Sequence, residues 1–209
     1  MEKIAKIVLS KNLVLAGSIE GASKETMETW VSDQVKNLDK IPSKKRISAI
    51  LKAIDKTNQN THAKVSCRSG CSHCCHQPIM ITAPEVEHIM EYVNKHHIEI
   101  DKSKLDIHSK WEKADYYKKE NRPLTGCVFL SKEGQCRIYD HRPATCRTYF
   151  VRSNPKFCKI KYKHKHPNYE IAINLKAEVL LSALWSYGGA VETLPKKVGG
   201  ILDGSHKNL

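Results

Sequence analysis

Apolar residues recur every three or four positions along much of the chain, which is the spacing of a helix that buries one face. Two such stripes occupy residues 23–40 and the stretch that follows Pro42. Their apolar members are Met27, Trp30, Val31, Val35 and Leu38, and then Ile47, Ile50, Leu51 and Ile54. Residues 1–22 are expected to form a further helix or a pair of strands, and residues 57–61 a polar connection.

The clearest start of a helix lies at Thr82. Its hydroxyl can cap the helix while the carboxylate of Glu85 accepts a bond from the backbone of Thr82, which is the capping-box arrangement. Pro84 fits the first turn, where its missing N–H has no partner to lose. The pattern predicts a helix that anchors the preceding cysteine segment against the core.

The middle of the chain is more polar. Residues 101–121 are rich in charge and are expected to form a solvated helix. Residues 127–130 and 135–139 are strand-like runs that flank Gly134, and they predict a β-hairpin with glycine at its turn.

Two more helices are predicted after this hairpin. Pro143 starts a short helix that runs through Cys146. An apolar helix is predicted over residues 169–187, and Gly188 and Gly189 supply its C-terminal stop.

Composition and local sequence indicate in which cellular compartment the protein is expected. The chain has 209 residues, eight of them cysteines, and a formal net charge of +13. Lys11 and Asn12 interrupt the N-terminal apolar stretch, so no export signal is expected, and no uncharged apolar run reaches the roughly 18 residues of a transmembrane helix. A cytoplasmic location is therefore expected, where clustered cysteines more often bind metal or do redox chemistry than form disulfides.

Seven of the eight cysteines fall into two short stretches, Cys67-x3-Cys71-x2-Cys74-Cys75 and a later one with Cys127, Cys136 and Cys146. Thiolates bind soft or borderline metals, and closely spaced ligands lose little chain entropy when one ion collects them. The sequence therefore predicts a metal or iron–sulfur site. The first three cysteines have the spacing of radical S-adenosylmethionine enzymes, but the chain is too short and too helical for the barrel of those enzymes.

The two stretches together resemble the CxxCxxCC family, also called the YkgJ-type cysteine-cluster family, of zinc- or iron-chelating domains. The resemblance covers about residues 64–152 and includes Gly134-Gln-Cys136-Arg-Ile-Tyr139 and Arg142-Pro143-Ala-Thr-Cys146-Arg147-Thr-Tyr149. It implies that zinc or iron, or an iron–sulfur cluster, is held by Cys67, Cys71, Cys74, Cys75, Cys127, Cys136 and Cys146. A related cysteine cluster occurs in bacterial flagellin lysine methylases.

The number of metal sites stays open, because these seven thiols exceed the four ligands of a tetrahedral zinc site. Either two ions share the set, with His73, His76 or His141 completing their shells, or one iron–sulfur cluster takes four thiolates and the other cysteines are structural or redox-active. A single cysteine such as Cys127 can also be an ordinary buried residue. Cys158 lies outside the family pattern.

Basic residues beside the cysteines also allow two interpretations. Arg137, Arg142 and Arg147 could bind anionic sulfurs or clamp a carboxylate or phosphate, or they could simply pair with Asp140 or Glu133. Residues 152–166 form a basic loop with six Lys or Arg. Its Phe157 and Tyr162 could stack on the bases of a nucleic acid, although a solvated basic face is commoner.

The sequence thus predicts a mainly α protein with a short β-hairpin, in which a small cysteine-rich, metal-centred domain packs on helices. Its expected parts are amphipathic helices over residues 1–62, a metal-binding domain over 63–190 and a loosely held tail over 191–209. The leading hypothesis is a metal that is structural or is handled for a protein partner. The alternatives are iron–sulfur-assisted methylation of protein lysine and a nucleic-acid-binding module, so whether the protein is an enzyme stays open.

Overall fold

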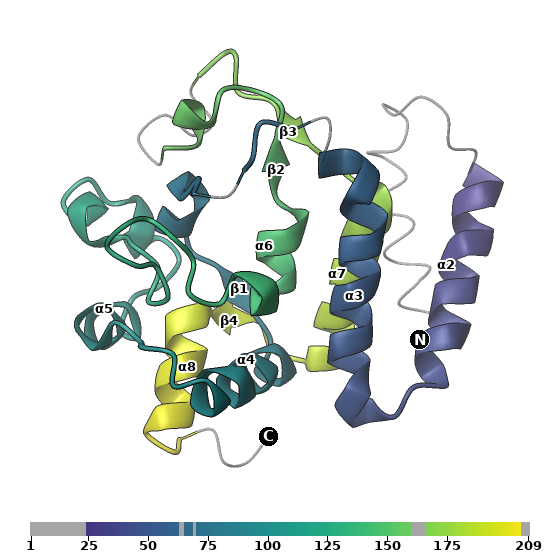
Figure 1. The fold of residues 1–209 in the computed structure, drawn as a ribbon, viewed down its shortest axis with the longest axis horizontal. Helices are drawn as coiled ribbons and strands as arrows, with labels where there is room; N and C mark the ends of the chain where they lie inside the picture. The colour runs from purple at the N-terminus through teal and green to yellow at the C-terminus, as the bar shows by residue number, and fades with distance from the viewer. Residues whose placement is uncertain (1–23, 63–64, 69, 160–165, 206–209) are drawn as a thin grey trace.

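The computed structural model describes residues 24–62, 65–68, 70–159 and 166–205, and this part of the chain is mainly helical (Figure 1). Its α-helices are α2 (Lys24–Asp39), α3 (Ser43–His62), α4 (Ala83–Lys95), α5 (Lys102–His108), α6 (Ala144–Thr148), α7 (Leu175–Gly188) and α8 (Leu194–Leu202). Its strands form two antiparallel pairs, β1 (Met80–Ile81) with β4 (Glu192–Thr193) and β2 (Phe150–Val151) with β3 (Ile171–Ala172). The predicted mainly α fold with short β pairs is confirmed, whereas the expectation for residues 1–22 falls outside the described residues.

None of the helices in the described part combines the length and the hydrophobicity that crossing a membrane requires.

One hydrophobic core forms where α3 packs on α6 and α7, and α2 lies beside α3 (Figure 1). The predicted stripe of α3 faces this core, because Ile50 and Ile54 are fully buried. Leu180 and Leu184 of α7 meet them from the other side. The periodic pattern therefore predicted the packed face of α3 correctly, whereas the helix expected over residues 169–187 begins only at Leu175 and is preceded by β3.

Helix α3 continues to His62, so residues 57–61 are helical and do not form the expected polar connection. Asn58 explains this difference, because it is only 1% exposed. Its side-chain amide donates to the carbonyl oxygen of Arg147 at 2.8 Å, and its Oδ1 accepts from Asn174 at 2.9 Å. A polar residue whose hydrogen bonds are satisfied can continue a buried helix.

A second core joins α4, α5 and α8 to the segment around Val128. Helix α8 lies in the region expected to be a loosely held tail, but Leu194 and Val198 are buried in this core. Strand β4, directly before α8, pairs with β1. Residues 192–202 are thus part of the packed fold, while the division of the chain into three parts remains a prediction.

The predicted capping box at the start of α4 is confirmed. The backbone N–H and the hydroxyl of Thr82 both donate to Glu85, each at 3.0 Å. The other oxygen of Glu85 accepts from the backbone N–H of Ala144 at 3.1 Å, the first residue of α6. One buried carboxylate therefore joins the starts of two helices that carry the cysteine segments into the core.

Two predicted elements in the middle of the chain differ from the structure. The solvated helix over residues 101–121 is reduced to α5, which is followed by turns and short 3₁₀ segments. The hairpin over residues 127–139 is reduced to a single bridge between Leu130 and Cys136. Val128 and Phe129 are both fully buried, which rules out the alternation of inward and outward side chains that a strand requires.

Candidate metal centre

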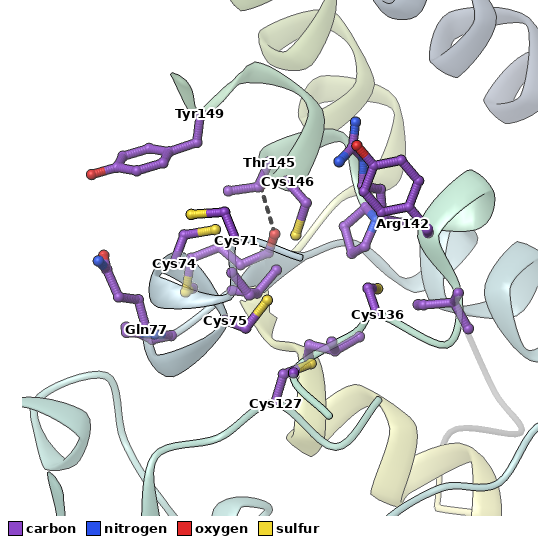
Figure 2. A pocket seen from close by; sticks show the side chains of 18 of the residues that line it. Cys71, Cys74, Cys75, Gln77, Cys127, Cys136, Arg142, Thr145, Cys146 and Tyr149 are labelled. Carbon is purple, nitrogen blue, oxygen red and sulfur yellow. Dashed lines mark hydrogen bonds between the residues drawn. The ribbon is translucent and has the colours of Figure 1, made fainter. Parts of the chain in front are cut away.

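Six cysteines from the two stretches line one cavity of about 280 Å³ (Figure 2). They are Cys71, Cys74, Cys75, Cys127, Cys136 and Cys146. The fold therefore brings the two stretches together, as the metal hypothesis requires. None of the eight cysteines is disulfide-bonded.

The first stretch reaches the cavity through a tight local turn. Gly70 has a φ of +81°, a conformation that glycine adopts without strain, and the N–H of Cys71 donates to the carbonyl oxygen of Arg68 at 3.0 Å. A 3₁₀ helix, η1 (His73–His76), then carries Cys74 and Cys75. Consecutive residues of such a helix point about 120° apart, so both thiols can face the cavity, which an extended chain would prevent.

The second stretch is held against the first by backbone hydrogen bonds. The N–H of Cys127 donates to the carbonyl oxygen of Cys75 at 2.8 Å. The chain then turns at Gly134, whose φ is +78°, and the bridge to Leu130 returns Cys136 to the cavity. Cys146 arrives on α6, which Glu85 anchors.

Cys67 and Cys158 do not line this cavity. The Sγ of Cys67 accepts a hydrogen bond from the N–H of Val151 at 3.4 Å, which fixes it beside strand β2. Cys67 still lies near enough to Cys74 and Cys71 for their charges to raise its pKa, although burial raises it more. Cys158 is also buried, and its carbonyl oxygen accepts from the side-chain amide of Gln77, a residue that lines the cavity, at 3.3 Å.

The electrostatics of the thiols reflect burial and their closeness to one another. Burial raises the pKa of Cys127 to about 12. Burial also raises the pKa of Cys146 well above its ordinary value, and Cys74, Cys127 and Cys136 add to this effect. A hydrogen bond with Cys74 is the largest cause that raises the pKa of Cys75, followed by burial. When these sulfurs ionise, their negative charges repel one another, and a bound cation would relieve this repulsion.

The donor set fits a soft or borderline ion, because thiols dominate it and no carboxylate among the described residues lines the cavity. As the side chains lie, no three Cys, His, Asp or Glu residues of the described chain stand close enough together to hold one ion. Binding would therefore require the sulfurs to draw together around the ion.

The three histidines proposed as additional ligands do not line the cavity. Nδ1 of His76 lies 3.4 Å from the hydroxyl of Thr125. The ring of His141 stacks on Tyr92, with centroids 3.7 Å apart. His73 lies near Lys159, whose charge, together with burial as the larger cause, lowers the pKa of His73.

The three arginines beside the cysteines differ in their partners. Arg137 forms an ion pair with Glu99 at 3.2 Å, and Arg147 pairs with Asp55, so both have the structural role, but with partners other than the expected Asp140 and Glu133. Only Arg142 lines the cavity. Its guanidinium lowers the pKa of Cys136 and Cys146, although burial outweighs this effect at both thiols.

Several cavity residues carried no signal in the sequence. Ile79, Ile138 and Leu194 form an apolar wall, and Lys113 and Tyr117 also line the cavity. Leu194 comes from the expected tail, and Lys113 and Tyr117 come from the expected solvated helix. Ile138 lies inside the family motif around Cys136, but the other four belong to no motif, so tertiary structure alone reveals their position.

Comparison with known proteins adds one match. A family model with the description "CxxCxxCC: Putative zinc- or iron-chelating domain" matches residues 66–172. That range contains all eight cysteines of the chain and both strands β2 and β3. No curated protein and no solved structure matches the chain.

Proposed function

This chain belongs to the CxxCxxCC family of zinc- or iron-chelating domains, and we propose that it holds its ion through the cysteines that line the cavity. The observation that carries this proposal is the meeting of two distant cysteine stretches on one cavity, which no carboxylate of the described chain lines. Thiolates favour zinc or iron over magnesium or calcium, which take oxygen ligands.

Four of the thiols form the best candidate set for one ion: Cys75, Cys127, Cys136 and Cys146. Backbone contacts connect three of them. The N–H of Cys127 donates to the carbonyl oxygen of Cys75, and the turn closed by the bridge to Leu130 brings Cys136 back to the cavity. Cys67, Cys71 and Cys74 then remain for a second ion. The rival arrangement, in which one iron–sulfur cluster takes four of the seven thiolates, uses the same residues and differs in colour and iron content.

The bound ion would tie η1 to the turn at residues 127–136 and to α6. We infer that it stabilises the fold, and that ligands beyond the first four hold a second ion for exchange with a protein partner. A closed four-thiolate site exchanges slowly because every coordination position is filled, whereas a site with three protein ligands keeps one position open.

The test is metal analysis of protein purified without oxygen, together with its absorption spectrum. We expect about one or two equivalents of zinc or iron per chain, and less than about half an equivalent would contradict the proposal. Colourless protein with stoichiometric zinc supports thiolate-bound zinc. A broad band near roughly 400 nm with iron and sulfide supports an iron–sulfur cluster.

Cys146→Ser and Cys158→Ser form a matched pair for this measurement. Cys146 lines the cavity, whereas Cys158 is buried and does not line it. The proposal requires metal content to fall in Cys146→Ser and to stay at the wild-type level in Cys158→Ser. Equal loss in both variants would point to general misfolding.

The alternative functions gain no support. Lysine methylation rested on a resemblance to flagellin lysine methylases, and no curated protein matches the chain. In the basic loop, residues 160–165 lie outside the described residues. Phe157 is already stacked on His166 at 3.6 Å between ring centroids, which occupies a face that a base would need.

A further inference from the structure

The cavity has more room and more apolar wall than an ion alone requires. Its volume is about 280 Å³, whereas one water molecule occupies roughly 30 Å³ in the liquid. Besides the thiols, the apolar residues Ile79, Met80, Ile138 and Leu194 line it. Apolar side chains cannot coordinate an ion, so this wall suits the apolar body of an organic ligand.

Arg142 places a positive charge in this cavity without a negative partner. Among the described residues no carboxylate pairs with it, and its Nε is buried without a hydrogen-bond acceptor. A buried donor that lacks an acceptor is destabilising, and a ligand that accepts from it removes this cost. The neighbouring Arg137 and Arg147 have their own carboxylates, which makes Arg142 the exception.

The guanidinium of Arg142 is held in position before any ligand arrives. It lies over the ring of Tyr139, with Cζ 4.2 Å from the centroid. The carbonyl oxygen of Arg142 accepts from Nε of Arg147 at 2.9 Å, which fixes the backbone. A planar guanidinium held in this way favours a carboxylate, which can accept two parallel hydrogen bonds.

The rim of the cavity carries positive charge, as Arg142 does. Lys113 lines it together with Tyr117 and Tyr139, which are 40% and 44% exposed. In the part of the chain that the structure describes, no Asp or Glu lines the cavity. The cavity thus combines an apolar wall, an aromatic rim and cationic groups, which favours an anionic head group over an organic cation.

We propose that this cavity binds a small organic carboxylate with an apolar body, with its carboxylate on Arg142 and its body against Ile79, Ile138 and Leu194. This inference goes beyond ion binding and rests on different residues, because none of these four is a proposed metal ligand. The ligand would lie next to the thiols, where it could reach a bound ion.

Hexanoate and hexan-1-ol are suitable probes, since they share an alkyl body and differ in the head group. We expect hexanoate to bind the as-purified protein with a dissociation constant of about a millimolar or below, and hexan-1-ol to bind at least about tenfold more weakly. The measurement is titration followed by calorimetry or by protein-observed NMR. Equal affinity for the two probes, or no hexanoate binding at millimolar concentration, overturns the proposal.

Variants then locate the carboxylate. Arg142→Gln is expected to weaken hexanoate at least about tenfold and to leave hexan-1-ol unchanged, whereas Arg137→Gln, whose side chain pairs with Glu99, should bind hexanoate like wild type. Lys113→Gln, a change at an exposed position, should weaken hexanoate a few-fold without any effect on folding. If Arg142→Gln lowers metal content while hexanoate still binds with wild-type affinity, Arg142 only balances thiolate charge and the inference is wrong.

Metal content is measured on the same samples. Protein that binds hexanoate but holds no metal would contradict the proposed function and leave this inference standing. Metal-loaded protein that does not bind hexanoate would contradict this inference and leave the proposed function standing.

Discussion

Three thiols in the cavity, Cys75, Cys127 and Cys146, are costly to ionise because burial and neighbouring sulfurs act in the same direction. The raised pKa of Cys75, Cys127 and Cys146 means that all three are neutral thiols at neutral pH. A metal ion must replace their protons, so protons compete with metal for the site. Apparent zinc affinity should therefore rise as the pH increases from about 6 to about 8, with two or more protons released per ion.

Calorimetric titration of zinc into metal-free protein checks this, in buffers of different ionisation enthalpy at one pH. The dependence of the observed enthalpy on the buffer gives the number of protons released. An enthalpy that is the same in all buffers would show that the thiols had ionised before the metal arrived, against their raised pKa.

Arg147 is the residue that fixes the later cysteine segment to the helical core. Its guanidinium pairs with Asp55 of α3 and donates to the carbonyl oxygens of Asp140 and Arg142, while its side chain is only 6% exposed. Arg147→Gln leaves these acceptors without partners and should lower the free energy of unfolding by about 2–4 kcal/mol. Urea denaturation measures this change in the free energy of unfolding.

Arg152→Gln is the matched control for that change. Arg152 also pairs with a carboxylate, that of Glu170 at 3.2 Å, but both side chains are more than half exposed. An exposed ion pair contributes about 0–1 kcal/mol, so this variant should stay close to wild type. Equal effects in the two variants would mean that the burial of Arg147 does not matter.

Helix α8 provides the clearest test at the scale of elements, because the sequence predicted a loose tail there. Leu194 is buried against α4 and the segment around Val128, whereas Leu202 at the other end is 54% exposed. Leu194→Ala should therefore cost about 2–5 kcal/mol of the free energy of unfolding, and Leu202→Ala should cost less than about 0.5 kcal/mol. If urea denaturation finds both changes neutral, residues 192–202 behave as the expected tail.

The elements that the sequence predicted well are those with local signals. The stripe of α3, the capping box at Thr82 and the stop of α7, where Gly189 has a φ of +70°, all depend on residues a few positions apart. Helix α8 lacks such a signal, since its sequence contains Pro195, two lysines and two glycines. It is stabilised by burial, including that of Lys197, whose ammonium reaches Glu192 at 3.2 Å.

The candidate site divides in the same way. The spacing of the cysteines indicated the donors, because only cysteine supplies a thiol and its positions can be read directly from the sequence. The wall and the rim, with Ile79, Leu194 and Lys113, could not be predicted, since they come from segments that meet only in the folded chain. Which of the three arginines faces the cavity was likewise decided by distant carboxylates, those of Glu99 and Asp55.

At the scale of the whole molecule, the cavity lies where the two hydrophobic cores approach each other. Cys127 and Cys136 pack against the core of α4, α5 and α8, whereas Cys146 sits on α6, which packs on α3 and α7. An ion that binds thiols from both sides would couple the cores, so that they unfold together. Its contribution to stability should then extend to the whole chain.

Removal of metal tests this coupling. Zinc at about one hundred times its dissociation constant should stabilise the fold by about 2.7 kcal/mol, which raises the melting temperature of a chain this size by roughly 5–10 °C. Calorimetry should show a single transition for loaded protein and a lower, broader or divided transition after chelation, because the two cores no longer share an ion. In Cys146→Ser the effect of added zinc should largely disappear, while Cys158→Ser, changed outside the cavity, should keep it. An unchanged melting temperature in chelated wild-type protein would show that the ion is carried without supporting the fold, and would leave exchange with a partner as its role.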